Sequence, residues 1–284
     1  MKSNHKILTL LLLGLGLLFS QCDKEENYII KNLNHNVIMI LGHGGMGDLY
    51  KYPNNTLEAI KPVIGIGADG TELDVQITKD SVLILFHDET LDGRTRCDGY
   101  SSPYNYNWSE IKDCYYNTLV DDIPIYSVDE VFSSLPNLND LYFSFDCKLN
   151  PELAYNEVYR RQFLGAIKRI CEKYNMSGNV FVESDLAFLL TAKDMGLTTK
   201  GIVVGSSVDQ ASDNNIFGIG TTVDTPPEEI DYAHSKGLYV MMWGAKSDAG
   251  NKKAIGLNPD FLQTDKPIPI LMLFERFDFD YDIP

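Results

Sequence analysis

Acidic residues alternate with apolar ones in two short segments, a pattern that could build a cation site. Glu72 and Asp74 lie in segment 71–77, and Asp146 and Lys148 lie in segment 141–149. Alternate side chains of a β-strand share one face, so each pair would project from one side of its strand. Clustered carboxylates repel one another unless a cation neutralises them, and oxygen ligands suit Ca²⁺ or Mg²⁺ better than zinc. The two segments therefore favour a site for a hard divalent cation.

Both segments also have a purely structural interpretation. Taken alone, segment 71–77 is typical of an alternating edge strand whose acidic face is solvated. Asp146 and Lys148 are equally consistent with a structural ion pair. Only convergence of the two segments on a common hollow separates a cation site from these alternatives.

Two of the five histidines stand at the ends of apolar runs. His43 follows the run 37–41 and precedes Gly44 and Gly45, which would let a ligand approach the backbone closely. His87 ends the run 82–87. A single histidine in such a place is more often a packing or surface residue than a catalyst. Two of them beside an acidic cluster indicate general acid/base chemistry.

The order of strand-like and helical segments along the chain predicts the scaffold that would position these residues. Strand-like runs separated by helical patterns indicate a parallel α/β protein, and the spacing predicts helices over 56–63 and 151–174. Nine runs are strand-like, one more than the eight of a TIM-type (β/α)8 barrel. The nine runs are 37–43, 70–77, 82–87, 141–148, 179–183, 201–204, 217–223, 238–243 and 260–264.

The extra run has a local explanation. Four residues, 78–81, leave no room for a crossover helix, so 70–77 and 82–87 are predicted to form an antiparallel hairpin. A turn centred on Lys79 and Asp80 places Glu72 opposite His87. After the hairpin, 92–124 loses the pattern and is interpreted as a small insertion over the barrel mouth that shapes substrate access.

Composition and charge limit the classes of function. The chain has 284 residues, 24 Lys and Arg, 40 Asp and Glu, and a net charge of −16. This acidity disfavours a nucleic-acid partner, because no basic stripe is present to contact phosphates. The five cysteines form no CxxC pair, which argues against a zinc ribbon or a thioredoxin-type site. Cys97 and Cys114 are the best candidates for a disulfide.

The N-terminus resembles an export signal. Lys2 and Lys6 precede an apolar run over 7–19, and residues 18–22 read LFSQC, like a bacterial lipobox. Residues 1–22 are therefore interpreted as a lipoprotein signal with Cys22 as the lipidated residue, 23–35 as an acidic tether and 36–284 as the barrel. This predicts a lipid-anchored protein of the bacterial cell envelope, on the periplasmic or outer-membrane face. Plain secretion and an uncleaved anchor are the alternatives.

Taken together, the motifs resemble the glycerophosphodiester phosphodiesterase family. The set is specific because many short motifs occur in the family's order and approximate spacing. They are 43–45 (HGG), 54–59 (NNTLEA), 72–80 (ELDVQITKD), 87–91 (HDETL), 122–124 (DIP), 145–148 (FDCK), Trp243 and 263–267 (QTDKP). The resemblance implies a TIM-type barrel that hydrolyses glycerophosphodiesters to glycerol 3-phosphate and an alcohol.

The resemblance also implies roles for individual residues. The metal ligands for Ca²⁺ or Mg²⁺ would be Glu72, Asp74 and Asp146. The general acid/base pair would be His43 and His87, with neither role assigned individually and the nucleophile either water or a substrate hydroxyl. Substrate contacts would come from Lys148, Gly44 and Trp243.

Two departures from the family pattern bear on substrate identity. The family usually has Arg after the first histidine, whereas Gly44 offers only backbone, so phosphate binding would depend on Lys148, the cation or Arg94. The third acid is usually Glu, and Asp146 is one methylene shorter.

Three functions are consistent with the sequence. The first is the metal-dependent phosphodiesterase described above. The second is a catalytically weak lipoprotein that binds a phosphoester or a glycan. The third is the same chemistry on a lysophospholipid or a glycerol-phosphate polymer, which the aromatic residues Tyr100, Tyr104, Tyr106 and Trp108 of the insertion could admit.

Overall fold

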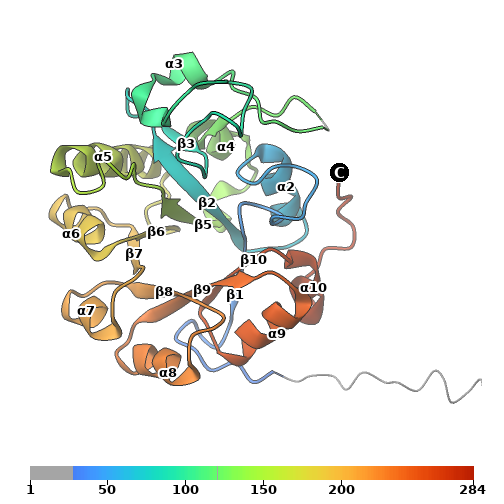
Figure 1. The fold of residues 1–284 in the computed structure, drawn as a ribbon. Coiled ribbons are helices and arrows are strands. Elements are labelled where there is room, and N and C mark those ends of the chain that lie inside the picture. Colours follow the sequence, from blue (N-terminus) through green and yellow to red (C-terminus); the bar gives the residue numbers. More distant parts are fainter. Residues whose placement is uncertain (1–27, 120) are drawn as a thin grey trace, which may run out of the picture.

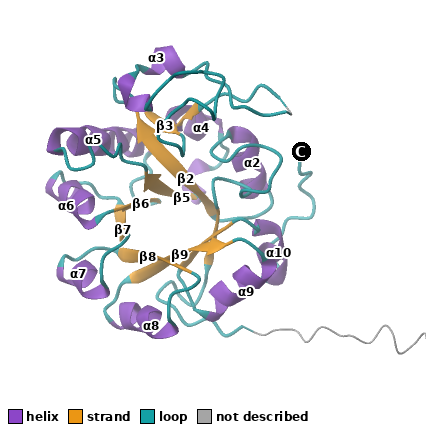
Figure 2. Ribbon diagram, viewed as in Figure 1, coloured by secondary structure: helices purple, strands orange, loops and turns teal. Residues whose placement is uncertain are grey.

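The computed structural model describes residues 28–119 and 121–284, so the predicted signal, Cys22 and the first residues of the tether lie outside the described residues. Within the described part, eight parallel strands close into a barrel (Figures 1 and 2). They are β1 (Met39–Gly42), β2 (Gly70–Ile77), β5 (Tyr142–Cys147), β6 (Val180–Ser184), β7 (Lys200–Val203), β8 (Gly218–Thr222), β9 (Tyr239–Ala245) and β10 (Phe261–Thr264). Pairing of β1 with both β10 and β2 closes the cylinder. The predicted TIM-type (β/α)8 fold is confirmed.

Helices surround the barrel, as Figure 2 shows. In chain order they are α2 (Leu57–Gly65), α4 (Val128–Ser134), α5 (Glu157–Tyr174), α6 (Leu186–Asp194), α7 (Val208–Asp213), α8 (Pro227–Ser235), α9 (Asp248–Gly256) and α10 (Pro267–Leu273). Several begin at a side-chain cap: Asn156 accepts from the backbone at the start of α5, and Ser127 and Glu130 form a capping box on α4. No helix of the described ranges has the length and apolarity to span a bilayer.

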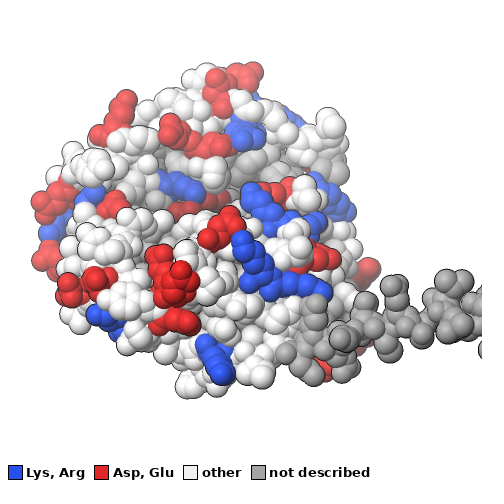
Figure 3. Space-filling view, turned by 60° about the horizontal axis from the view of Figure 1, so that its bottom comes forward, with Lys and Arg blue, Asp and Glu red and all other residues white. Residues whose placement is uncertain are grey.

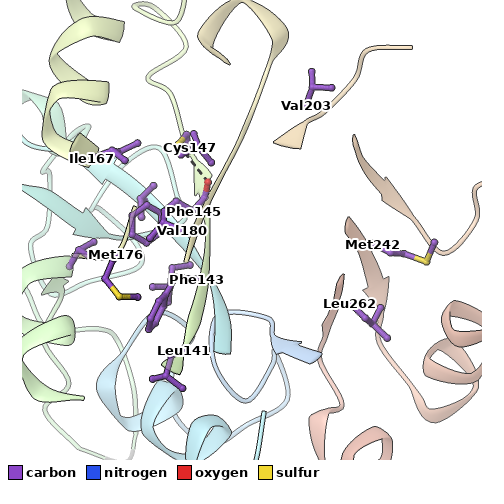
Figure 4. Packing of buried hydrophobic residues seen from close by; sticks show 14 of the residues in the cluster. Leu141, Phe143, Phe145, Cys147, Ile167, Met176, Val180, Val203, Met242 and Leu262 are labelled. Carbon is purple, nitrogen blue, oxygen red and sulfur yellow. Dashed lines mark hydrogen bonds between the residues drawn. The ribbon is translucent and has the colours of Figure 1, made fainter. Parts of the chain in front are cut away.

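The main core lies between the strands and the helices. Phe143 and Phe145 on β5 are fully buried, and Figure 4 shows them in a row along the strand near Met176 and Val180. The alternate residues of β5 face the barrel axis, because successive side chains of a strand point to opposite faces. Apolar packing on the outer face of β5 thus directs Ser144 and Asp146 into the barrel.

The side chains that fill the barrel interior change from apolar to polar along the barrel axis. A second cluster, centred on Leu41, Phe181, Ile202, Met241 and Phe261, fills the interior with apolar side chains. Two residues further along their strands, Leu41 is followed by His43 and Phe181 by Glu183. The polar side chains therefore form a layer above the apolar cluster, towards the carboxyl ends of the strands. Barrel enzymes place their active sites at this end.

The hairpin after β2 is present, but its predicted register is wrong by one residue. Val75 pairs with Leu85 in β3 (Leu83–Leu85), so Glu72 does not face His87. The turn contains one more residue than expected, because Ser81 adopts a positive φ of 65°. The chain leaves the sheet after Leu85, and β3 pairs on its other edge with the short strand β4 (Tyr126–Ser127), which the sequence pattern did not indicate.

The segment between β3 and β4 forms a small subdomain beside the barrel, at the top of Figure 1. It contains η1 (Pro103–Asn105) and α3 (Trp108–Ile111) and has its own apolar cluster around Phe86, Leu91 and Ile111. The predicted disulfide between Cys97 and Cys114 is confirmed, with a Cα–Cα distance of 5.5 Å. A further short helix, η2 (Leu138–Asp140), precedes β5.

Candidate active site

Three carboxylates from two neighbouring strands meet at the barrel mouth. Asp74 on β2 pairs directly with Asp146 on β5, and Glu72 lies two residues earlier on β2. One oxygen from each side chain lies within 4.8 Å of the others. Glu72 and Asp74 are buried, with 2% and 4% of their surface exposed. The convergence that the alternation predicted is therefore present, and a solvated acidic edge strand is excluded.

Two of the three carboxylates have raised pKa values. Burial raises the pKa of Glu72 well above its usual value, and the charges of Asp74 and Asp146 raise it further. Burial also raises the pKa of Asp146, although Lys148 opposes this effect. Glu72 and Asp74 are buried and Asp146 is partly exposed, so the cluster offers only carboxylate oxygens to a ligand and fits a hard divalent cation.

Backbone and amide groups hold these carboxylates in place. Asn55 donates from Nδ2 to Asp74 Oδ2 at 2.6 Å and accepts from the backbone N–H of Asp74 at 2.9 Å. The N–H of Gly44 donates to Glu72 Oε2 at 2.9 Å. These contacts engage a carboxylate oxygen of Glu72 and both a carboxylate oxygen and the backbone N–H of Asp74, so these two acids are oriented before any ligand binds. Asn55 belongs to the 54–59 motif, but the sequence alone assigned it no role.

Lys148 lies among the acids. Its Nζ is 3.0 Å from Asp74 Oδ1 and 2.5 Å from Asp146 Oδ2. Burial would lower the pKa of Lys148, but the charges of these two carboxylates outweigh it and raise the pKa. Lys148 therefore offsets part of the acidic charge in the cluster. Its contact with a phosphate stays a prediction.

His43 has one ring nitrogen held and one directed towards the acids. Nδ1 lies 2.6 Å from Asp265 Oδ1, whereas Nε2 lies 4.0 Å from Glu72 Oε2. Burial alone would lower the pKa of His43, but the hydrogen bond to Asp265 and its charge outweigh burial and raise it. An ionised Asp265 can only accept, so Nδ1 carries the proton and Nε2 is the nitrogen available for proton transfer. Asp265 lies in the 263–267 motif, yet no role was predicted for it.

His87 reaches the mouth from the loop after β3, with 63% of its side chain exposed. Its Nδ1 lies 3.1 Å from Asp88 Oδ1. Gln76, the third inward residue of β2, donates from Nε2 to the carbonyl oxygens of Phe86 at 2.9 Å and of Asp88 at 2.8 Å. These two carbonyls flank His87, so Gln76 fixes the backbone that carries the histidine.

A cavity of about 740 Å³ opens in front of these residues and is lined by His43, Asp74 and His87. A second cavity, of about 480 Å³, shares His87 and Asp88 with the first and has Lys148 in its wall. His87 therefore stands between two hollows. Their volumes lie in the range that accommodates small-molecule ligands.

Trp243 is not among the residues that line either cavity. It lies on β9, where its ring is close to Gly220 of β8, and its contact with substrate stays a prediction. The aromatic residues of the insertion also turn away: Tyr100 stacks on Tyr106 at 4.7 Å, and Tyr104 packs on Tyr159. None of the four aromatic residues singled out from the sequence lines the main cavity, whereas Tyr116 does.

Asn54 fills the space in which a side chain at position 44 would begin. A Cβ added to Gly44, whose φ is +57°, would lie 2.6 Å from Asn54 Cβ and 2.8 Å from its Cγ. Asn54 is itself held by Asp48, to which its Nδ2 donates at 2.7 Å. The glycine that replaces the family's usual Arg is therefore matched by a neighbour that leaves no room for the longer side chain.

A buried glutamate lies below the carboxylate cluster. Glu183 on β6 accepts hydrogen bonds from Ser144 and from Gln263. Burial and the charge of Asp146 raise the pKa of Glu183 to about 7, although both hydrogen bonds oppose the shift. No sequence signal marked Glu183, because a single acid at the end of a strand-like run has no distinctive pattern.

Comparison with protein families gives a match over residues 43–268 to the family described as the glycerophosphoryl diester phosphodiesterase family. A glycerophosphodiester phosphodiesterase of Bacillus altitudinis is 30% identical over 234 residues, which cover 76% of this chain and 90% of that protein. Another, from Caldanaerobacter subterraneus subsp. tengcongensis, is 45% identical over 62 residues, covering 22% of this chain and 25% of that protein.

Solved structures show the same fold. A Silicibacter pomeroyi protein described as a candidate glycerophosphoryl diester phosphodiesterase has a TM-score of 0.75 at 18% identity, covering 84% of this chain and 93% of its own. An Oleispira antarctica phosphodiesterase, solved in complex with the product sn-glycerol-3-phosphate, has a TM-score of 0.71 at 16% identity. That match covers 84% of this chain and 96% of the other.

Proposed function

The chain belongs to the glycerophosphoryl diester phosphodiesterase family, and on this premise we propose that it hydrolyses glycerophosphodiesters to glycerol 3-phosphate and an alcohol with a divalent cation and two histidines. One observation supports this most strongly. His43, His87 and Asp74 line a single cavity, and Asp74 belongs to a cluster of three carboxylates. A protein that only binds a phosphoester has no need of both proton-transfer groups beside a cation site.

The carboxylates of Glu72, Asp74 and Asp146 would hold the cation, Ca²⁺ or Mg²⁺. When bound, the ion would supply positive charge for the phosphoryl oxygens of the substrate. Lys148 contributes a further positive charge beside the cluster. Since position 44 has no side chain, these charges and Arg94, which lines the cavity, take the place of the usual Arg in binding phosphate.

Proton transfer is the task of the histidines. His43 presents Nε2 while Asp265 holds Nδ1, and His87 stands on the boundary between the two cavities. One imidazole accepts a proton from the nucleophile and the other donates a proton to the alcohol that leaves. This division is consistent with either water or a substrate hydroxyl as the nucleophile.

The direct test is release of glycerol 3-phosphate from glycerophosphocholine and glycerophosphoethanolamine by the full chain. We expect release that chelation abolishes and that Ca²⁺ or Mg²⁺ restores, and a loss of about 10²-fold or more in His43→Ala and His87→Ala. His35→Asn is the matched control, because His35 is exposed, has a positive φ that Asn tolerates, and does not line the cavity. Tight binding of glycerol 3-phosphate without any turnover would instead support the binding lipoprotein.

Cation binding has a readout that does not depend on activity. Ca²⁺ or Mg²⁺ should raise the melting temperature of the full chain, because a ligand that binds only the folded state stabilises it. Glu72→Gln should remove most of this increase. An unchanged increase in Glu72→Gln would contradict the proposed ligand set.

We further propose that Cys22 carries a lipid anchor in the bacterial cell envelope, where the enzyme would recover glycerol 3-phosphate from deacylated phospholipids. The pattern of residues 1–22 supports this proposal. Labelled palmitate should be incorporated into the full chain expressed in bacteria and not into Cys22→Ser. Incorporation into both, or into neither, would contradict lipidation at Cys22.

A further inference from the structure

The wall of the main cavity is less acidic than the chain as a whole. Lys51, Arg94 and Lys246 line the cavity together with Asp48, Asp74 and Asp88, so cations and carboxylates are equal in number there, in a protein whose net charge is −16. On the face shown in Figure 3, basic side chains occur in groups among acidic ones. The distribution of charge at the cavity therefore differs from the average of the chain and bears on the ligand that the cavity takes.

Two of these cations are matched by acids in the same wall. Arg94 Nε lies 2.5 Å from Asp88 Oδ2, and Lys246 Nζ lies 3.5 Å from Asp48 Oδ2. Asp48 also accepts from Asn54. Asp74, the third acid of the wall, lies 3.0 Å from Nζ of Lys148. Each acid of the wall is thus paired with a cation, while the guanidinium of Arg94 keeps further N–H donors for a ligand, because the ion pair uses its Nε.

Lys51 is the surplus charge. It is exposed, and among the described residues no carboxylate lies within ion-pair distance of its Nζ. Its Nζ instead lies over the ring of Tyr52, 4.9 Å from the centroid. Tyr52 and the neighbouring Tyr50, whose rings are 5.8 Å apart, are two of the aromatic residues of the wall that could contact a quaternary ammonium group, besides Phe86 and Tyr116. Lys51 therefore occupies one of the aromatic faces that a choline group could use.

The main cavity is large enough to hold more of the substrate than its phosphodiester group. The cavity has a volume of about 740 Å³, and the histidine and carboxylate side chains account for only part of its lining. The three cations come from the loops after β1, β3 and β9, so the charge surrounds the hollow from several sides. Because each carboxylate of the wall is paired with a cation, the ammonium group of Lys51 is an excess positive charge that an anionic group bound there would meet.

Resting on the proposed function, we infer that the enzyme selects diesters whose leaving alcohol carries an anionic group, a phosphate or a carboxylate, over diesters of neutral or cationic alcohols. Lys51 and Lys246 are the residues that determine this specificity, because they contact the alcohol half of the substrate while Arg94 binds the phosphodiester. Neither lysine takes part in proton transfer.

The experiment compares kcat/KM for three diesters that share the glycerophosphoryl half and differ in the charge of the alcohol. The substrates are glycerophosphocholine, glycerophosphoglycerol and glycerophosphoglycerol with a terminal phosphate, assayed with the full chain and a divalent cation. We expect kcat/KM to rise in that order, with the anionic substrate favoured over the neutral one by about fivefold to tenfold and less so at high salt.

Charge variants identify the residues responsible. Lys51→Gln should reduce the preference for the anionic substrate over the neutral one, and Lys51→Gln with Lys246→Gln should abolish it. Lys61→Gln is the matched control, because Lys61 is exposed on α2 and does not line the cavity. A preference that survives the double variant would overturn the inference.

The failures of the two proposals give different results. Release of glycerol 3-phosphate from all three substrates, with glycerophosphocholine equal to or better than the anionic diester, would overturn the inference and leave the proposed function intact. An absence of release from every substrate would contradict the proposed function, and the inference with it.

Discussion

Asp265 accepts a hydrogen bond from Nδ1 of His43 at 2.6 Å, although 222 residues separate them in the chain. His43 stands at the end of β1 and Asp265 at the end of β10, two strands that pair side by side when the barrel closes. Closure of the barrel therefore creates the pair. Asp265 is buried and its own pKa is lowered, because the hydrogen bond and charge of His43 outweigh the effect of burial.

Asp265→Asn should shift the pH profile of the enzyme. Removing the charge of Asp265 lowers the pKa of His43, so the limb of the kcat/KM profile that reports His43 moves to lower pH whether the histidine serves as base or as acid. We also expect a loss of about tenfold or more in kcat/KM, because the amide no longer favours the tautomer with the proton on Nδ1. Asp48→Asn is the control: Asp48 lies 3.8 Å from Nδ1, beyond hydrogen-bond distance, and its variant should move the limb less. Equal shifts in both variants would contradict a specific role for Asp265.

Gln76→Met should impair catalysis by releasing the backbone around His87. The variant leaves the carbonyl oxygens of Phe86 and Asp88 without their donor, at a cost of about 1 to 3 kcal/mol in stability. We expect the fall in kcat to be larger than the fraction of unfolded protein at the assay temperature can explain. Gln162→Met is the control, since Gln162 also donates two hydrogen bonds, to Lys79 and Ser81 at the hairpin turn. A loss of stability in Gln76→Met with kcat unchanged would reduce Gln76 to a structural role.

Glu183→Gln should stabilise the protein at pH 8 in the presence of a chelator and have little effect at pH 5. The pKa of Glu183 is raised in the folded state to about 7. For a carboxyl with a raised pKa, stability is highest below the unfolded-state pKa, falls as pH rises, and reaches its lowest level above the folded-state pKa. The neutral amide avoids this penalty, which amounts to at most about 3 kcal/mol for a shift of this size. Urea unfolding at the two pH values measures the effect; a variant less stable than the wild type at pH 8 would contradict it.

Gly44→Arg should destabilise the protein instead of restoring a phosphate clamp. The added Cβ would meet Asn54 Cβ at 2.6 Å, and the positive φ of Gly44 penalises any side chain. We expect a loss of about 1 to 3 kcal/mol in the free energy of unfolding. Asn54→Ala should recover part of it in the double variant, and a double-mutant cycle by urea unfolding gives the coupling energy. A coupling energy of zero would show that Asn54 does not restrict position 44.

Much of the barrel and of its acidic cluster could be predicted from the sequence, because both depend on short-range periodicity. The two-residue alternation of a strand placed Glu72, Asp74 and Asp146 on inward faces, and the apolar runs marked all eight barrel strands. The same local signals did not reveal β4, whose two residues are too few for a pattern. The hairpin register was missed because it depends on one residue, Ser81, with a positive φ.

What the sequence by itself determined is therefore the presence of the chemical groups and the kind of scaffold that carries them. The partners of those groups were decided only by the tertiary structure: Asp265 for His43, Asn55 for Asp74, Gln76 for the loop of His87 and Asn54 for Gly44. Each of these contacts joins separate strands or loops. Periodicity within one element sets the face on which a side chain lies, whereas contacts between elements depend on how the barrel closes and where its loops turn.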